Sequence, residues 1–230
     1  SVPLAVSEKY GLWYDPMTDS YTKVQLTGNE LLVNLKSGES RILVCSDNED
    51  LYPEGVDNDK VSDVSEEIDL TANKWTLSFI DEQPKVGTTY KLDSLQTWET
   101  LGDSAAVMMG TGVYETIVKL SRDAACGNWS IDLGDVRESA RVYINNVYVG
   151  CAWAVPFVLN CKNVFKKGKN IIRIEVTNLP ANRIADLDRK GVKWRKMKEI
   201  NVVDINYKRT TYENWKPVPS GISKVRLVKN

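Results

Sequence analysis

Side chains able to do chemistry are most concentrated between residues 178 and 194, where arginines, aspartates and amides fall close together. The polar members of this group are Asn178, Asn182, Arg183, Asp186, Asp188, Arg189, Lys190 and Lys193. Arginine and aspartate form strong charge-assisted hydrogen bonds, so one interpretation is that the group pairs internally and braces a long loop. The other interpretation is a contact with a ligand or partner, made by Arg183, Asp186, Asp188 and Trp194.

The chain contains no histidine. This absence excludes Ser-His-Asp and Cys-His nucleophile systems, histidine-ligated zinc and every imidazole proton shuttle. Acid or base catalysis would depend on carboxylates, lysine, tyrosine or cysteine. With 31 acidic residues in the chain, composition alone does not exclude a catalytic carboxylate pair.

The charge balance and hydropathy exclude two further classes of function. Over 230 residues, 30 basic and 31 acidic side chains give a formal charge of −1, which supplies no field to attract a phosphate backbone, so nucleic-acid binding is not expected. No apolar run approaches the roughly 18 residues of a membrane-spanning helix, so no span is predicted. The opening residues lack the pattern of a signal peptide and suggest a trimmed or partial chain.

The four cysteines are Cys45, Cys126, Cys151 and Cys161, and no two form a C-x-x-C pair. Zinc-ribbon and thioredoxin-like sites therefore fail on spacing. Cys151 and Cys161 flank a short aromatic segment, so a disulfide between them is geometrically reasonable. The alternative is that the cysteines are isolated and apolar, because free cysteine packs as a small hydrophobic side chain.

Residues 1–61 are predicted to form a small β-rich subdomain ending in an acidic linker. Apolar runs at 23–26, 31–35 and 41–45 have strand length and are separated by turn-forming residues, while the aromatic pair at 13–16 is expected to dock as a tip. The segment 46–60 is rich in aspartate, glutamate and asparagine, which favours a solvated loop over a Ca²⁺ loop because the ordered calcium motif is missing.

Residues 62–230 show a persistent strand pattern. Ile172, Ile174 and Val176 alternate with polar residues, and Asn145-Asn146 is typical of a two-residue hairpin turn. Strands are predicted at 75–80, 112–120, 129–133, 141–145, 147–150, 170–177, 201–207 and 224–228. The charged stretch 184–200 lacks this alternation and is predicted to be a long loop with at most one or two helical turns. Many short strands joined by turns favour a β-sandwich or jelly roll.

A series of motifs in this second part resembles a known family. The series is Trp98-Glu99-Thr100-Leu101-Gly102-Asp103, Gly110-Thr111-Gly112, Ile131-Asp132-Leu133-Gly134-Asp135, Ala140-Arg141-Val142-Tyr143-Ile144-Asn145, Trp153 with Pro156-Phe157, Ile174-Glu175-Val176-Thr177-Asn178 and Ser220-Gly221-Ile222. Its order resembles the galactose-binding-like jelly-roll domain, called the sugar-binding domain, of glycoside hydrolase family 2. It is most similar to the version at the C-terminal end of bacterial α-L-rhamnosidase-like proteins.

The resemblance covers roughly residues 70–230 and departs from the family at two places. Met108-Met109 stand where the strand entry usually reads Phe-Ser-Gly-Thr, which affects a pocket wall, and Asn146 stands where glycine is common. What the resemblance implies is an all-β fold, a galactose-binding-like jelly-roll β-sandwich preceded by a small β-rich subdomain. The predicted domains are therefore 1–61 and 62–230.

The resemblance also implies a function. In such enzymes the catalytic carboxylates lie in a separate barrel domain, so no catalytic residue carries over and activity of this chain alone is not expected. The expected role is a non-catalytic module that binds a plant or host glycan or supports an adjacent catalytic domain. No cofactor is required, and a structural Ca²⁺ is left open. A monomer located in the periplasm or outside the cell is expected.

Carbohydrate binding combines aromatic platforms with planar hydrogen-bonding groups. Tryptophans in loops are more often exposed than those in strands, and four of them fall in predicted loops: Trp98, Trp153, Trp194 and Trp215. The predicted carbohydrate-binding residues are Trp98, Asp103, Trp153, Asn178, Arg183, Asp186, Asp188 and Trp194. Two alternatives stay open, namely a purely architectural module that docks onto a neighbouring domain and, more weakly, a degenerate hydrolase with a carboxylate pair at the loop ends.

Overall fold

The computed structural model describes residues 1–26, 30–35, 37–54, 56, 66–196, 206 and 210–229. The chain divides into two compact units, Ser1–Asp63 and Val64–Asn230. The domain boundary predicted at residue 61 falls within 57–65, outside the described residues, as does most of the strand predicted at 201–207. No helix in the described ranges is long and apolar enough to cross a membrane.

The N-terminal unit is built on a three-stranded antiparallel sheet in the order β3-β2-β5. The strands and the short helix of this unit are β1 (Val2–Pro3), β2 (Tyr10–Asp15), β3 (Ser20–Gln25), β4 (Glu30–Leu31), β5 (Ile42–Ser46) and the 3₁₀ helix η1 (Glu49–Leu51). The strands predicted at 23–26 and 41–45 are confirmed in β3 and β5. Two predictions are wrong. The residues at 13–16, expected to dock as an aromatic tip, lie mainly in the central strand β2. The strand predicted at 31–35 is also wrong, because β4 ends at Leu31 and Leu32 is 71% exposed.

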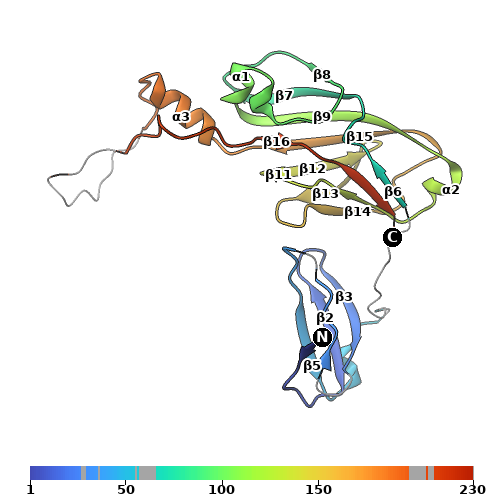
Figure 1. The fold of residues 1–230 in the computed structure, drawn as a ribbon. Helices are drawn as coiled ribbons and strands as arrows, with labels where there is room; N and C mark the ends of the chain where they lie inside the picture. The colour runs from blue at the N-terminus through green and yellow to red at the C-terminus, as the bar shows by residue number, and fades with distance from the viewer. Residues whose placement is uncertain are drawn as a thin grey trace. The chain divides into compact units, whose positions relative to one another are not determined.

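The second unit contains a six-stranded antiparallel sheet in the order β13-β12-β15-β9-β7-β8 (Figure 1). Its strands are β7 (Trp75–Gln83), β8 (Tyr90–Leu92), β9 (Met109–Leu120), β12 (Ser139–Ile144), β13 (Val147–Ala152) and β15 (Gly168–Thr177). Side chains alternate along β9 from Tyr114 to its end, so that Tyr114, Thr116 and Val118 are buried while Glu115 and Ile117 are exposed. This period of two gives the sheet one core face and one outer face.

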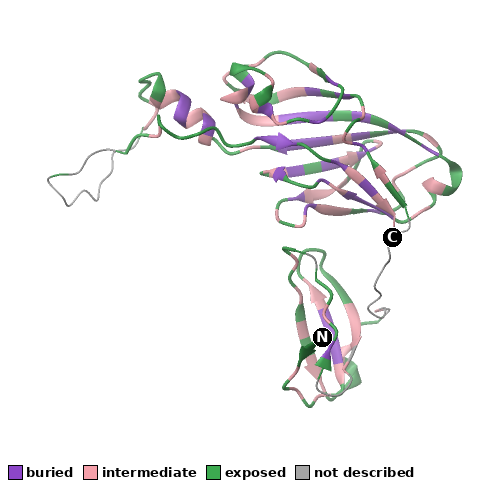
Figure 2. Ribbon diagram, in the orientation of Figure 1, coloured by how far each residue is buried: buried purple, intermediate pink, exposed green. Residues whose placement is uncertain are grey.

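A second layer faces the core side of that sheet. Its four-stranded sheet has the order β14-β10-β17-β6, and a two-stranded sheet pairs β11 with β16. These strands are β6 (Glu66–Asp69), β10 (Trp129–Asp132), β11 (Val136–Arg137), β14 (Val158–Cys161), β16 (Gly221–Ile222) and β17 (Arg226–Lys229). Buried side chains from both layers, such as Ile174 and Leu227, belong to one hydrophobic core (Figure 2). The predicted all-β sandwich is confirmed.

Helices are few and short in the described part of the second unit. They are η2 (Trp98–Thr100), α1 (Asp103–Ala106), α2 (Arg122–Ala125) and α3 (Ala181–Arg189). Residues 184–189 of α3 fit the one or two helical turns allowed in the predicted loop, but the helix begins earlier than predicted, at Ala181. The helical pattern of α3 is carried by charged residues and was therefore not recognised as a helix. These residues pair at helical spacing, with Asp186 accepting hydrogen bonds from Arg183 and Lys190.

All four cysteines are free thiols, which decides against the Cys151–Cys161 disulfide. Cys151 is the register partner of Arg141 in the six-stranded sheet, on its outer face. Cys161 is the register partner of Trp129 in the four-stranded sheet, and its side chain is buried. Burial raises the pKa of the Cys161 thiol to about 12. Cys161 therefore stays protonated and acts as a packing residue, in line with the apolar interpretation.

Trp98 connects the two layers at the centre of the core. Its side chain is fully buried, and its Nε1 donates a hydrogen bond of 2.6 Å to Tyr114 Oη. Burial raises the pKa of the Tyr114 phenol well above its ordinary value. A methyl group on Gly221 would come within 2.3 Å of that oxygen, and one on Gly112 within 2.6 Å of the indole ring. The two glycines are therefore needed for the indole to fit.

This close fit makes Gly221 a sensitive position, and Gly168 is its matched control. Both have a φ of 90°, but nothing lies within 4 Å of a methyl group placed at Gly168. We expect Gly168→Ala to lower the free energy of unfolding by about 1 kcal/mol through backbone strain alone. Gly221→Ala should lower it by about 3 kcal/mol, because crowding adds to the strain. Urea denaturation measures both, and equal losses would contradict the role given to Trp98.

Candidate functional site

The polar residues singled out between 178 and 194 are held on an arm that leaves the sandwich where β15 ends. Figure 1 shows α3 lying beyond the end of the sheets, and the chain returns from it toward β16. We define the arm by its described residues, 179–196 and 210–219. The residues at its base and along α3 decide whether it is a braced structure or a loop with free polar groups.

Asn178 fastens the base of the arm. Its Oδ1 accepts a hydrogen bond of 3.0 Å from the backbone N of Gly110. Its Nδ2 donates to the Met108 carbonyl at 2.9 Å and to Ser220 Oγ at 3.1 Å. Both ends of this amide are engaged by two separate chain segments, 108–110 and Ser220, so Asn178 is a structural residue and the prediction that it binds sugar is not supported by its geometry.

A second amide ties α3 to the returning chain. Asn182 is buried, its Nδ2 donates to the Val218 carbonyl at 2.8 Å, and its Oδ1 accepts from the Val218 backbone N at 2.9 Å. The Asn182 amide and the Val218 backbone thus exchange two hydrogen bonds, in the same way as two paired residues of an antiparallel sheet. It fixes the distance between the helix and the segment that runs back to β16.

The two aspartates of α3 are both engaged. Asp186 is 6% exposed and accepts hydrogen bonds through Oδ2 from Arg183 Nη1 at 2.8 Å and from Lys190 Nζ at 2.9 Å. Asp188 accepts through Oδ1 from Trp194 Nε1 at 2.6 Å and through Oδ2 from the Tyr212 backbone N at 2.8 Å. These contacts favour the bracing interpretation of the charged group.

Asp188 thereby assembles an aromatic surface, which we call the arm cluster: Trp194, Tyr212, Trp215 and the guanidinium of Arg195. The ring centroids of Tyr212 and Trp215 are 4.5 Å apart, and those of Trp194 and Tyr212 are 6.4 Å apart. Arg195 lies 5.0 Å from the Trp194 ring and 5.2 Å from the Tyr212 ring. The indole of Trp215 is 50% exposed. The result is a packed, partly exposed aromatic group.

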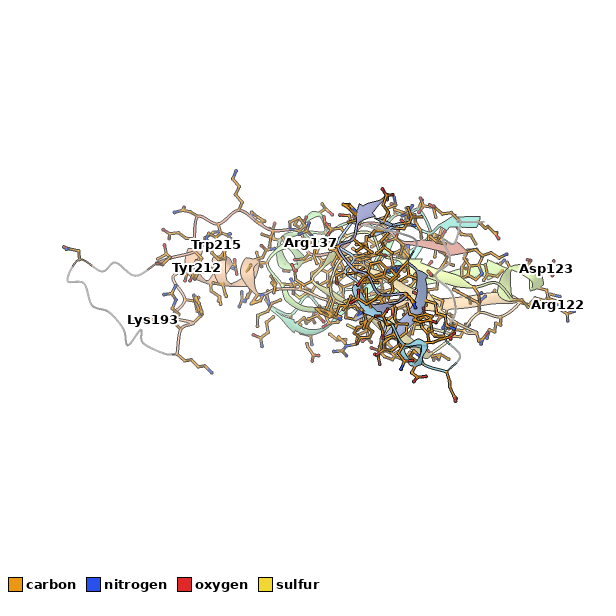
Figure 3. All side chains as sticks on the ribbon, turned by 90° about the horizontal axis from the view of Figure 1, so that it is seen from below. Arg122, Asp123, Arg137, Lys193, Tyr212 and Trp215 are labelled. Carbon is orange, nitrogen blue, oxygen red and sulfur yellow. The ribbon has the colours of Figure 1, made fainter. Side chains whose placement is uncertain are left out.

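The returning chain is held in place by Arg189. Its Nε donates to the Glu213 carbonyl at 3.0 Å and its Nη2 to the Trp215 carbonyl at 3.3 Å. Figure 3 shows Tyr212 and Trp215 at one end of the second unit, with Arg122 and Asp123 of α2 at the other end. Long loops usually need such ties to stay ordered, and these ties present the Trp215 ring to solvent.

Three further predicted residues lie apart from the arm cluster. Trp98 is fully buried in the core, so the prediction that it is an exposed platform is wrong; η2 lies under the second layer because Trp98 N donates to the Ser220 carbonyl. Asp103 is exposed at the first residue of α1. Trp153 follows β13 and is 64% exposed, as its loop position predicts.

The prediction of site residues missed Tyr212 and left out Trp215. A usable signal was present, because the two aromatic residues are three positions apart in an otherwise polar stretch, 210–216. What the sequence did not reveal is that Asp188, 24 residues earlier, accepts a hydrogen bond from the Tyr212 backbone. That contact joins the two halves of the cluster.

The described residues contain no group of three or more Asp, Glu or Cys side chains placed to hold a metal ion. In the acidic segment 46–60, Asn48 instead caps η1, accepting from the Asp50 backbone N at 3.1 Å, while residues 55 and 57–60 lie outside the described part. A structural calcium ion therefore stays a prediction. In the arm, the paired Asp186 and Asp188 are not available as a catalytic acid and nucleophile.

No family model matches the chain. A "Putative beta-glucuronidase" from Formosa agariphila is 29% identical over 159 residues, which make up 64% of this chain and 14% of that protein. A solved rhamnosidase from Novosphingobium sp. PP1Y covers 98% of this chain, with a TM-score of 0.70 and 21% identity, and this chain covers 21% of it.

These similarities confirm the resemblance to glycoside hydrolases that the motifs indicated. The structural likeness shows the fold of the chain. The chain spans about a fifth or less of the length of either relative. Activities named for the whole relatives therefore do not transfer directly to this chain.

The contacts of Asp188 give a test of how the arm cluster is built. Asp188→Ala removes the acceptor of the Tyr212 amide and of the Trp194 indole. Hydrogen bonds to charged groups contribute about 1.5–3 kcal/mol, so we expect exchange of the Tyr212 amide to accelerate about 10- to 100-fold. Hydrogen–deuterium exchange resolved to single amides measures this.

Asp103→Ala is the matched control, because Asp103 is exposed and its side chain has no hydrogen-bond partner among the described residues. Its exchange pattern over 210–216 should equal that of the wild type. Unchanged Tyr212 exchange in Asp188→Ala would show that the arm cluster is held by other contacts.

Proposed function

We propose that this chain is a non-catalytic accessory module of a glycoside hydrolase-like protein and that its arm cluster contacts carbohydrate. The observation that carries the proposal is the Trp194–Tyr212–Trp215 group, fixed by Asp188 and half-exposed at Trp215. A rigid aromatic surface loses little conformational entropy on binding, and it covers the apolar face of a sugar ring.

Polar groups next to these rings supply the remaining chemistry. Lys193 and Glu213 are exposed and adjacent in sequence to cluster residues. An ammonium and a carboxylate beside an aromatic platform can donate to and accept from ring hydroxyls, which gives the contact a preferred orientation. Trp153 is a second exposed indole, so it stays a candidate for a separate glycan contact.

The non-catalytic part of the proposal is supported by the contacts of the carboxylates on the arm. Hydrolysis of a glycosidic bond needs two carboxylates facing each other across a cleft, about 5–10 Å apart. The buried aspartate of the arm, Asp186, is neutralised by Arg183 and Lys190. We infer that the catalytic groups lie in a neighbouring domain or chain, that the module acts on plant or host glycans, and that it works outside the cytoplasm as a monomer.

A second function is favoured by the bracing itself. The contacts of Asn182 and Arg189 would equally well hold the arm in position to dock onto a neighbouring domain. In that case the arm cluster would be buried in an interface of the larger protein. This alternative module has no affinity for free sugars and shapes an adjacent active site only through its position.

Glycan-array screening followed by calorimetric titration distinguishes the two functions. If the arm cluster binds carbohydrate, Trp215→Ala should weaken binding about tenfold or more, since stacking on one ring contributes on the order of 1.5 kcal/mol. Arg183→Ala should have little effect, because Arg183 contacts Asp186 within the helix. Trp153→Ala measures the separate contribution of the isolated indole.

Thermal denaturation of each variant checks that the fold is intact. Trp215→Ala should melt close to the wild type, because half of this side chain is already exposed. If no glycan on the array binds the wild-type chain, the carbohydrate contact is refuted and the architectural alternative is supported.

A further inference from the structure

An open hollow lies on the outer face of the six-stranded sheet, formed by residues outside the arm cluster. It has a volume of about 520 Å³, within the range of small-molecule sites. Ile117 and Ile171 are among its lining residues and are 54% and 45% exposed. They are register partners on β9 and β15, so they form a continuous apolar floor.

One lysine lines the hollow and two more lie beside its floor. Lys74 lines the hollow beside Ile117, held there because Thr116 Oγ1 donates to the Lys74 carbonyl at 2.9 Å. Lys119 and Lys169 are exposed register partners two residues beyond the isoleucines, on the same face of the sheet. Two like charges directly opposite each other destabilise an antiparallel pair, so this arrangement has a cost in the isolated chain.

No carboxylate of the described residues forms an ion pair with any of these lysines. The neighbouring Arg173 and Arg141 are different, because both contact Glu175 on the same face. Glu115 is the acidic residue among those lining the hollow. The lining itself holds one lysine and one glutamate, and Lys119 and Lys169 beside it give the wider surface an excess of positive charge, although the whole chain has a formal charge of −1.

Hydrogen-bonding groups complete the rim. Asn73, Thr76 and Glu115 line the hollow, and none of these three side chains has a hydrogen-bond partner among the described residues. An amide, a hydroxyl and a carboxylate together offer donors and acceptors suited to sugar hydroxyls. The hollow therefore combines an apolar floor and a polar rim, and the excess of positive charge lies beside it at Lys119 and Lys169.

We propose that this hollow is a binding site for an acidic glycan. A sugar ring packs its apolar face on Ile117 and Ile171, and its hydroxyls meet Asn73, Thr76 and Glu115 along the rim. The carboxylate or sulfate groups of the chain face the lysines. A bound anion would offset the repulsion between Lys119 and Lys169, so the unfavourable placement of two opposed lysines is compensated when the ligand is bound.

Other ligand classes fit these features less well. A neutral glycan leaves the opposed lysines without a counter-charge. A nucleic acid finds no aromatic side chain among the lining residues on which its bases could stack. An acidic protein segment satisfies the lysines but does not use the rim of small hydrogen-bonding groups around a floor of two side chains. The site goes beyond the arm cluster and does not depend on it.

The test compares four polymers immobilised on a biosensor at low ionic strength: polygalacturonate, dextran sulfate, neutral dextran and polyglutamate. We expect wild-type protein to bind one or both acidic glycans and to bind neutral dextran and polyglutamate at least about tenfold more weakly. Which acidic glycan binds distinguishes carboxylate from sulfate recognition. Binding should weaken as salt is raised through about 0.15 M, where the Debye length is about 8 Å.

The decisive variant is Lys119→Gln/Lys169→Gln. Two exposed charge contacts contribute about 1.4 kcal/mol together, so its affinity should fall about tenfold. Lys85→Gln/Lys162→Gln is the charge-matched control, since both of its lysines are exposed and neither lies on β9 or β15, the strands that carry the opposed pair. Its affinity should stay within about twofold of the wild type.

Ile117→Ser tests the apolar floor. Ile117 is more than half exposed, so the fold should persist, and the affinity for the acidic glycan should fall about threefold through lost apolar contact. Equal losses in the two double-lysine variants would refute the site, because binding would then follow overall charge alone. So would polyglutamate binding as tight as that of the glycans, or no binding of any polymer.

Discussion

The antiparallel ladder between β9 and β15 is the constraint on which the rest of the second unit depends. It pairs ten residues without a break, from Gly168 with Leu120 to Thr177 with Thr111. Because side chains alternate, this single register puts Tyr114 and Ile174 into the core and sends the lysines and isoleucines of the hollow outward. A slip of one residue would exchange the two faces, so the core and the proposed acidic-glycan site are set by the same hydrogen bonds.

The arm extends this constraint beyond the sheets. Asn178, directly after β15, fastens the start of β9 and the chain before β16, so the arm leaves from a fixed point. Asp188 then joins the two sides of the arm by accepting from Trp194 and from the Tyr212 backbone. Asn178 and Asp188, which were expected to contact a ligand, thus stabilise the arm and its aromatic surface, because carboxylates and amides that are removed from water must be hydrogen-bonded.

The two proposed contact surfaces differ in physical character. The arm cluster is aromatic and rigid, so it favours the apolar faces of sugars with little dependence on salt. The hollow on the sheet is cationic, so its binding depends on ionic strength and on charged groups of the glycan. An accessory module with both would hold an acidic polysaccharide at two separate points, and joining two weak contacts raises the overall affinity without either becoming strong.

The sequence by itself determined the elements with local periodicity: the alternation of Ile172, Ile174 and Val176 predicted β15 and its buried face, and the order of motifs predicted the jelly roll. It did not determine which loop tryptophan was exposed. Trp98 is buried because Gly221, far along the chain, leaves space for its ring. The sequence also did not determine whether Lys119 lies opposite a carboxylate or another lysine, because this depends on the register between β9 and β15. Local patterns fix the faces of strands, whereas contacts between distant segments exist only once the chain has folded.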